Sequence, residues 1–391
     1  MALKYCFKKI IDDMHIAFVL NTYSPFSGLA RDFMRIANVC QERGHTIHVY
    51  VMSWHGDVLP SFDVHIMGIK GLSNHAKVAY FHQKLNIELR KAKHDCVVGF
   101  NKMPMLDVYF AADTCYVERF ENAPFWKKLN PRYRVYSKAE QTVFGDESET
   151  VCLMISDMQV KQFKKFYGVP DKRLVLLPPG IDVDRRRPKD WIKIRKKFRE
   201  KHGLKDDDLL VLMVGTGFKT KGVDRAIEAI ASLSKFEKAR VSLMVVGEGD
   251  HRAYSRLAND KGVGNRVCFM GGRSDVPEFL LGADLLLQPS RKESAGMVIL
   301  EAIVSGLPVL VSGVCGYAKH VEKSQAGVVL EEPFLQESLN ENLVKMMSSD
   351  KQNWVQNALK YADSEDLYSM PIKAAEVIEQ VAREKSVCHS S

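Results

Sequence analysis

The stretch ADLLLQPSRKESAGMVILEAIVSGLPVLVSG, residues 283–313, decides the fold. It begins with an apolar run, 283–290, and ends with a second one, 307–313. Between them lie a polar loop and a helical pattern that starts near Gly296. Two strands joined by a helix form the unit of a parallel sheet. We therefore predict a parallel sheet that helices cover on both faces.

The same alternation of short apolar runs and helical patterns extends over most of the chain. Helices are expected at 29–43 and 76–94, and almost everything after residue 334 has a helical pattern. The other expected strands are 15–21, 45–52, 62–69, 96–101, 108–113, 151–156, 209–216, 241–249 and 266–272.

The alternation pauses at 178–206, where PPGIDVDRRRPKDW is followed by the very basic helical pattern IKIRKKFREKHG. We interpret this segment as a domain junction. The prediction is two doubly wound α/β domains, 1–180 and 181–369, with a C-terminal helix at about 370–391 that packs back on the first. Ligands bind beyond the carboxyl ends of the strands in such sheets, so the loops of the two domains are expected to face a central cleft. A two-substrate enzyme and a hinged binding protein both suit this layout.

Composition narrows the class of protein. Of the 391 residues, 46% are hydrophobic and 27% are charged, which excludes global disorder and a coiled coil. No apolar run approaches the roughly 20 residues of a membrane-spanning helix. The first thirteen residues lack a sustained apolar stretch, so we expect no signal peptide, and Met14 is an alternative start. The net charge of +8 permits an anionic partner.

The eight cysteines have no Cys-x-x-Cys spacing, and most lie in apolar runs. We expect reduced, structural thiols and a cytoplasmic protein. They are Cys6, Cys40, Cys96, Cys115, Cys152, Cys268, Cys315 and Cys388.

The loop and helix after residue 290 carry two carboxylates, Glu293 and Glu301. A helix N-terminus with free backbone N–H groups is an anion site, and the helix near Gly296 offers one. A carboxylate beside a diphosphate is repelled unless it binds hydroxyl groups, as a sugar would provide. The alternative is that Glu293 caps the helix and Glu301 is a solvated helix position.

This stretch resembles the Glu-x7-Glu motif of the retaining nucleotide-sugar glycosyltransferases of family four, which have the GT-B fold. The resemblance implies that Glu293 binds donor sugar hydroxyls and that Glu301 binds the ribose. Three further segments resemble parts of that family: Ser27–Asp32 its N-terminal glycine loop, Val214–Arg225 its donor-diphosphate loop, and Pro178–Asp182 its junction.

Longer blocks, such as GFNKMPMLDVYFAADTCY and VGTGFKTKGVDRAIEAIASL, resemble the lipopolysaccharide core glucosyltransferases within that family. The resemblance implies transfer of glucose from UDP-glucose to an inner-core heptose of lipopolysaccharide in an α-1,3 linkage. It also implies work at the cytoplasmic face of the inner membrane, where the lipid A–core acceptor is anchored. Another UDP-hexose or acceptor heptose, a sugar-binding protein without turnover, and an epimerase of similar fold are the alternatives. Lys221 argues against the binding protein, which needs no cation for a diphosphate.

The resemblance implies roles for individual residues. Asp113, Glu293 and Lys221 are the catalytic candidates, with Lys221 neutralising the leaving phosphate and Asp113 orienting or polarising groups. Relatives carry an arginine where this chain has Thr220, and Lys219 is the nearest substitute, although a lysine cannot copy a bidentate contact. The expected donor contacts are Gly28, Asp32, Arg185, Lys219, Lys221, Arg273, Glu293, Ala295, Gly296, Met297, Val298 and Glu301.

The segment 126–138 mixes cations with aromatic residues, a combination that suits an anionic membrane surface. Single-stranded nucleic acid and an ordinary solvated loop are the alternatives, and we expect no nucleic acid. The expected membrane contacts are Trp126, Lys127, Lys128, Arg132, Arg134 and Lys138.

We expect no cofactor and no metal, because no Asp-x-Asp motif is present and Lys221 with the helix N-terminus can neutralise a diphosphate. We interpret four histidines on strand patterns as packing or edge residues. They are His15, His45, His48 and His65.

Overall fold

A computed structural model describes residues 13–25, 27–58 and 60–388. The expectation about a signal peptide falls on residues outside this description. The chain forms two compact units: one runs to Leu177 and resumes at Ser369, and the other spans Pro178–Tyr368. The boundaries expected from the sequence were 180/181 and 369/370.

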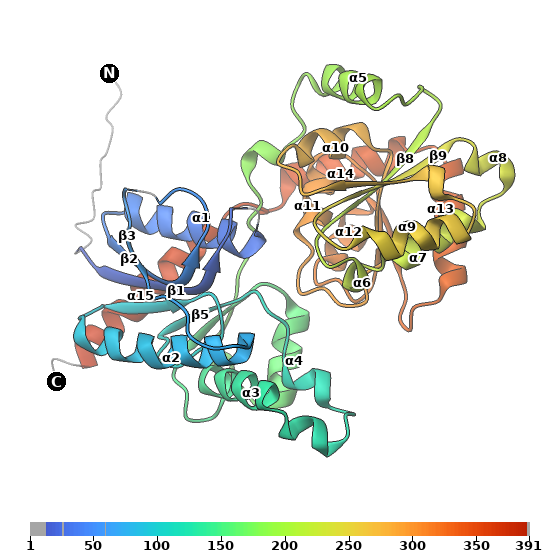
Figure 1. Cartoon of the computed structure of the whole chain (residues 1–391). Helices are drawn as coiled ribbons and strands as arrows, with labels where there is room; N and C mark the ends of the chain where they lie inside the picture. The colour runs from blue at the N-terminus through green and yellow to red at the C-terminus, as the bar shows by residue number, and fades with distance from the viewer. Residues whose placement is uncertain (1–12, 26, 59, 389–391) are drawn as a thin grey trace, which may run out of the picture. The chain divides into compact units, whose positions relative to one another are not determined.

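The first unit contains a seven-stranded sheet in the order β3-β2-β1-β4-β5-β6-β7 (Figure 1). All neighbouring strands are parallel, and the order 3-2-1-4-5-6 is that of a doubly wound nucleotide-binding fold. The strands are β1 (His15–Tyr23), β2 (Thr46–Trp54), β3 (Asp63–Ile66), β4 (Cys96–Gly99), β5 (Val108–Ala111), β6 (Val151–Met154) and β7 (Leu174–Leu176).

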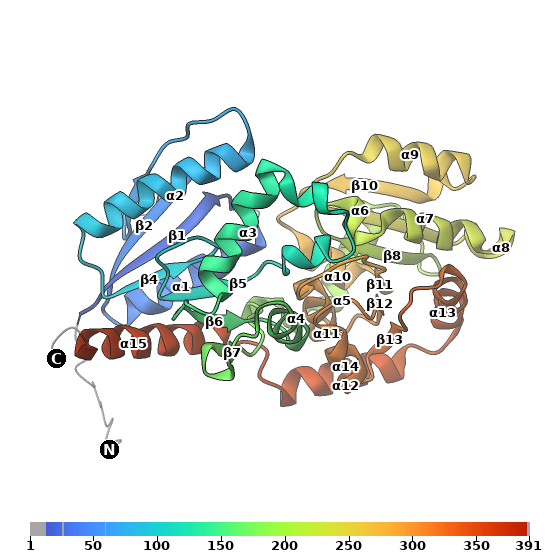
Figure 2. The ribbon, with the colours of Figure 1, turned by 90° about the horizontal axis from the view of Figure 1, so that it is seen from below.

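Helices cover both faces of this sheet (Figure 2). On one face, α1 (Gly28–Glu42) and α15 (Met370–Cys388) pack apolar side chains such as Phe33 and Ile378 against Phe18 of β1. The C-terminal helix therefore belongs to the same hydrophobic core as the first strand. The other face is covered by α2 (Asn74–Lys91), α3 (Pro131–Phe144) and α4 (Asp157–Tyr167).

The second unit repeats the topology with a six-stranded parallel sheet in the order β10-β9-β8-β11-β12-β13. Its strands are β8 (Leu209–Val214), β9 (Val241–Val246), β10 (Val267–Gly271), β11 (Leu285–Gln288), β12 (Val309–Ser312) and β13 (Gly327–Leu330). Its helices are α5 (Trp191–Lys201), α6 (Phe218–Lys221), α7 (Val223–Ser232), α8 (Lys235–Lys238), α9 (His251–Asp260), α10 (Val276–Gly282), α11 (Met297–Val304), α12 (Ala318–Ser324), α13 (Gln336–Ser348) and α14 (Gln352–Ser364).

The prediction of a doubly wound parallel fold is confirmed in both units. Two strands were not predicted, β7 and β13, each of which forms the edge of its sheet. β7 has only three residues, none of which is fully buried. β13 has four, and only Leu330 among them is fully buried. Such short, half-buried segments lack the apolar run that marks a central strand.

The thiols behave as small apolar groups. Six described cysteines are unpaired, and all of them except Cys268 are buried. Burial raises the pKa of the Cys40, Cys115, Cys152 and Cys315 thiols to about 12. These groups therefore stay protonated near neutral pH. None of the helices in the described part of the chain is both long and apolar enough to cross a membrane.

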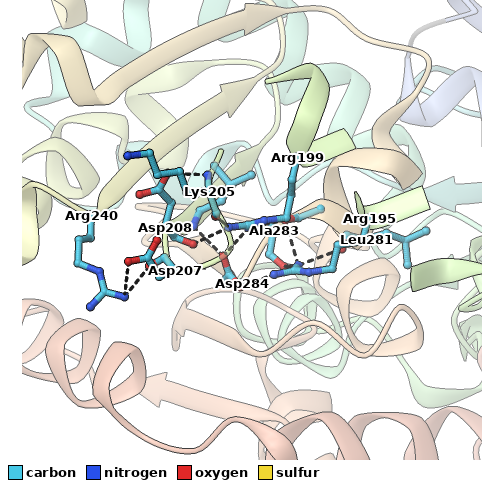
Figure 3. Close-up of polar contacts among 11 residues, drawn as sticks. Arg195, Arg199, Lys205, Asp207, Asp208, Arg240, Leu281, Ala283 and Asp284 are labelled. Carbon is cyan, nitrogen blue, oxygen red and sulfur yellow. Dashed lines mark hydrogen bonds and ion pairs between the residues drawn. The ribbon is translucent and has the colours of Figure 1, made fainter. Parts of the chain in front are cut away.

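The basic helix α5 is fastened to the second unit by one carboxylate, Asp284, at the start of β11 (Figure 3). Arg195 donates to Asp284 at 2.6 Å and Arg199 at 3.1 Å, and the same carboxylate accepts the Leu210 N–H at 2.8 Å. Both guanidinium groups also donate to backbone carbonyls, those of residues 281–283 and of Lys205 and Asp208. One anion thus satisfies two largely buried cations and a strand N–H.

We predict that Asp284→Asn lowers the free energy of unfolding of the second unit by about 3 kcal/mol, because it leaves two enclosed guanidinium groups without a counter-charge. Hydrogen exchange of peptides that cover β8 and β11 measures this free energy for the unit alone.

Asp207 provides the matched control, since its contact with Arg240 at 3.5 Å lies at an exposed position in the same region (Figure 3). Asp207→Asn should change the free energy by less than about 0.5 kcal/mol. Equal effects of the two substitutions would contradict a central role for Asp284.

Candidate active site

The loop after β8 is built around a lysine that folds back across a glycine. Gly215 has a φ of +149°, and a Cβ there would lie 2.7 Å from Cε of Lys221. A side chain at residue 215 would therefore displace the lysine. Gly222, with a φ of +74°, ends α6, and a Cβ at this position would lie 2.2 Å from the Pro289 carbonyl oxygen. The two glycines hold Lys221 against the strand ends.

Lys221 forms an ion pair with Glu293, which lies in the loop that follows β11. The side chains are 19% and 16% exposed, so each retains a route to solvent. The pair brings together a cation and a carboxylate from neighbouring strand ends, the edge where doubly wound sheets bind ligands. These are two of the three catalytic residues predicted from the sequence, and the structure joins them directly.

Two arginines hold the loops after β8 and β11 together. Arg291 makes a bidentate contact with Asp224 at 2.8 and 2.6 Å, and its backbone N–H donates to the Thr220 carbonyl at 2.8 Å. Arg225 donates to the carbonyls of Pro289 and Ser290 at 3.1 and 3.2 Å. Burial raises the pKa of the Asp224 carboxyl, but the Arg291 guanidinium outweighs burial and the pKa is lowered.

These supporting residues were not predicted. The opposite charges of Asp224 in KGVDR and Arg291 in RKES were the signal in the sequence for their contact. Arg291 also donates to the Lys219 carbonyl at 3.1 Å. A guanidinium therefore lies beside the loop that contains Thr220, where Asp224 binds it.

The helix after Glu293 begins at a left-handed glycine. Gly296 has a φ of +89° and precedes α11, and the Ala295 carbonyl accepts the Tyr317 N–H at 2.8 Å. Glu301 is only 6% exposed, so its interpretation as a solvated helix position is wrong. In the described structure, Ala295 and Val298 are buried, whereas Met297 is half-buried at the first turn of the helix.

In the described part of the chain, three predicted donor residues make no hydrogen bond or ion pair with Lys221 or Glu293. The Arg185 carbonyl accepts a 3.4 Å bond from Ser305, at the opposite end of α11 from Gly296. Arg273 makes a bidentate contact with Asp275 at 2.8 and 2.5 Å, which raises the pKa of the guanidinium. Lys219 is exposed on α6.

In the first unit, a cavity of about 210 Å³ lies at the carboxyl ends of β1, β4 and β5. Asp113 lines it with Asn21, near the end of β1, and with Asn101, which follows the neighbouring strand β4. The Asn101 side chain accepts the Asn21 N–H at 2.8 Å. The cationic side chains that line it are Lys102, Arg119 and Arg132. The cavity can therefore bind a ligand that carries both hydroxyl groups and negative charge.

A buried carboxylate, Glu140 on α3, fixes the loop that follows Asp113. It is fully buried, forms an ion pair with Lys102, and accepts the N–H groups of Tyr116 at 2.7 Å and of Val117 at 3.1 Å. Lys102 also donates to the Thr114 carbonyl at 2.8 Å. Sequence reasoning missed Glu140 because an acidic residue in a helical pattern ordinarily lies at the surface.

The N-terminal loop candidates have different surroundings. Gly28 is the first residue of α1, and a Cβ there would meet no atom within 4 Å, which leaves room for a ligand. Asp32 lies on the same helix and pairs with Arg35 at 2.5 Å.

The candidate membrane residues form an exposed patch that extends further than predicted. Phe125 and Trp126, 73% and 60% exposed, are neighbouring rings with centroids 5.5 Å apart. Leu129 is exposed beside them, and the sequence analysis named neither Leu129 nor Phe125. Arg132 is exposed and also lines the cavity near Asp113. The other basic members, all exposed, are Lys127, Lys128, Arg134 and Lys138.

Known proteins resemble this chain over nearly its whole length. Residues 26–185 match Glycosyltransferase Family 4, and residues 194–361 match Glycosyl transferases group 1. The lipopolysaccharide glucosyltransferase WaaG of Escherichia coli K12 is 44% identical over 93% of this chain and 98% of its own length.

Solved structures give the same result. The crystal structure of WaaG, a glycosyltransferase involved in lipopolysaccharide biosynthesis, matches with a TM-score of 0.90 over 93% of this chain and 99% of that one. Anabaena HepE in complex with UDP and glucose matches with a TM-score of 0.73 at 19% identity, covering 94% of this chain and 100% of its own, which is a likeness of fold alone.

The ion pair predicts opposite effects of its two members on UDP binding. Lys221→Ala should weaken UDP binding roughly 10- to 100-fold, because a charge-assisted contact contributes about 1.5–3 kcal/mol. Glu293→Gln should leave the affinity for UDP unchanged or raise it, because the lysine loses its competing partner. Calorimetric titration with UDP measures both.

Lys219→Ala is the matched control for Lys221, since it removes a lysine from the same short helix. A greater loss of UDP affinity in Lys219→Ala than in Lys221→Ala would contradict the prediction, because Lys219 would then be the lysine that contacts the diphosphate.

Proposed function

Because this chain belongs to the glycosyltransferases of the WaaG family, with the GT-B fold, we propose that it transfers glucose from UDP-glucose to an inner-core heptose of lipopolysaccharide. The proposed linkage is α-1,3, formed with retention at the donor carbon. As a glycosyltransferase, the chain is neither a sugar-binding protein without turnover nor an epimerase.

The Lys221–Glu293 pair is the observation that carries the donor assignment. A UDP-sugar offers a diphosphate and a hydroxyl-bearing ring joined by one bond. The cation complements the diphosphate, and the carboxylate complements the hydroxyl groups. Binding then exchanges one ion pair for two ligand contacts, so neither partially buried charge is left without a partner.

We assign the chemical step as follows. The bond from the anomeric carbon to the phosphate oxygen breaks while the acceptor oxygen attacks from the same face of the sugar. Lys221, with the N–H groups at the start of α11, stabilises the charge that develops on the leaving diphosphate. The leaving phosphate takes the proton of the acceptor hydroxyl, and Asp113 orients that hydroxyl. Glu301 binds the ribose in this proposal, and no metal takes part in the step.

The cavity beside Asp113 supports an acidic saccharide acceptor. Arg119 and Arg132 contribute positive charge, whereas Asn21 and Asn101 offer hydrogen bonds to hydroxyl groups. Lipid A–core saccharides combine hydroxyl groups with acidic groups, which matches this lining.

Transfer assays with UDP-glucose, UDP-galactose, UDP-N-acetylglucosamine and GDP-mannose on a heptose-terminated lipopolysaccharide acceptor test the proposal. UDP-glucose should have the highest kcat/KM. Glu293→Gln should lower this value about 100-fold, or about 3 kcal/mol, because contacts to the sugar hydroxyls strengthen in the transition state. Preferred use of another donor, or wild-type turnover by Glu293→Gln, would contradict the assignment.

We also propose that residues 125–138 hold the enzyme at the cytoplasmic face of the inner membrane. The exposed Phe125, Trp126 and Leu129 would enter the interface, and the neighbouring cations would contact anionic lipid. Each such cation contributes about 1 kcal/mol, and salt screens the contribution. A membrane-anchored acceptor would then be within reach of the adjoining cavity.

This proposal predicts co-sedimentation with liposomes that rises with the fraction of anionic lipid and falls as salt is added. Replacing Lys127, Lys128, Arg134 and Lys138 by glutamine should abolish binding. The variant retains Arg132, because that residue also lines the cavity. UDP binding should not change, since its contacts lie in the other unit.

The matched control removes four exposed lysines from the basic helix α5, Lys193, Lys196, Lys197 and Lys201. Loss of liposome binding in this control but not in the patch variant would refute the assignment of the membrane surface.

A further inference from the structure

Two histidines and an aspartate converge at the edge of the first unit's sheet. Nδ1 of His48 lies 3.0 Å from Oδ2 of Asp63, and Nε2 of His65 lies 2.9 Å from the same oxygen. One potential ligand atom from each of the three residues lies within 4.8 Å of the others. We propose that these side chains form a binding site for a divalent transition-metal cation of the zinc class.

Strand register explains why the three side chains meet. In the parallel pair β2–β3, His48 is opposite Asp63 and Tyr50 is opposite His65. Residues two apart on a strand share a face, so all four side chains point to the same side of the sheet. β3 is an edge strand, and Asp63 is exposed on it, so an ion and its remaining water ligands have access.

The donor set fits zinc better than magnesium or calcium. Imidazole nitrogen and carboxylate oxygen are common zinc ligands, whereas magnesium and calcium prefer oxygen alone. A zinc ion at about 2.1 Å from each ligand holds tetrahedral ligands about 3.4 Å apart. The two observed distances are about 0.5 Å shorter, and all three ligand atoms lie within 4.8 Å of one another, so the side chains must rotate to admit the ion.

A third histidine provides the outer contact that metal-binding histidines ordinarily have. Nε2 of His48 lies 3.1 Å from Nδ1 of His15, on the neighbouring strand β1. If Nδ1 of His48 binds the metal, its Nε2–H donates to His15, which fixes both the tautomer and the ring orientation. The rings of His15 and His48 are also stacked, with centroids 5.4 Å apart.

This site is independent of the proposed transferase site. His15 and Asp63 are the first residues of β1 and β3, and His48 lies near the start of β2. Asn21, Asn101 and Asp113 lie at or beyond the other ends of parallel strands. A metal at the strand starts would join the edge strand β3 to β2 and stabilise the sheet without touching the substrates.

Titration of the full chain with Zn²⁺ tests the proposal, using protein that carries no polyhistidine tag and has been stripped with a chelator. Calorimetry should show one equivalent of Zn²⁺, which excess Mg²⁺ does not displace. Co²⁺ in place of Zn²⁺ should give visible absorption bands of a nitrogen- and oxygen-bound ion. Zn²⁺ should also raise the unfolding temperature, because it binds the folded state.

The variants separate ligands from neighbours. Loss of the outer contact in His15→Ala should weaken Zn²⁺ binding roughly 10- to 100-fold. The ligand substitutions His65→Ala and Asp63→Asn should weaken it further and remove the thermal shift. His55→Ala, which removes an exposed histidine outside the cluster, should have no effect on binding.

Transfer activity should be unchanged in all of these variants, which shows that they fold and separates this test from that of the transferase. Absence of binding to the wild-type chain would overturn the proposal. So would binding that survives both ligand substitutions, because the ion would then lie elsewhere.

Discussion

The ion pair between Lys221 and Glu293 is the contact on which the proposed donor site depends, because it joins loops at the ends of two neighbouring strands. Opposite charges that are only 19% and 16% exposed must neutralise each other or a ligand. Three neighbouring residues of the second unit help to keep the two side chains together. Gly215 makes space for the lysine, Gly296 turns the chain after the glutamate, and Arg291 holds the two loops at a fixed separation.

In the first unit, a buried carboxylate holds the loop that carries a candidate site residue. Asp113 is exposed and must be held in position by the loop around it, and Glu140 provides the support from inside the protein. A fully buried carboxylate is costly unless its oxygens are satisfied, and Lys102 with the N–H groups of Tyr116 and Val117 satisfies them. The contacts with Glu140 therefore fix the conformation of the loop, although the chain at Asp113 is neither helix nor strand.

The sequence was sufficient for the fold because apolar strands and amphipathic helices are determined by local periodicity, as 283–313 illustrates. It also indicated Lys221 and Glu293 as candidates, through motifs shared with a known family, and the structure joins the two in an ion pair. It was insufficient for Glu140, Arg291 and Asp284, whose contacts join segments 23 or more residues apart. No periodicity encodes such contacts. The sequence left the burial of Glu301 open, because a carboxylate in a helix is ordinarily solvated.

In both parallel sheets, the two ends of the strands carry different kinds of residues. Candidate substrate groups follow the carboxyl ends of the strands, where Asp113 and Glu293 lie. The strand starts carry contacts that hold the sheets to neighbouring elements: Asp284 fastens α5 in one unit, and Asp63 gathers two histidines in the other. Because all strands run the same way, the stabilising charges at the strand starts stay a full strand length from the candidate substrate groups.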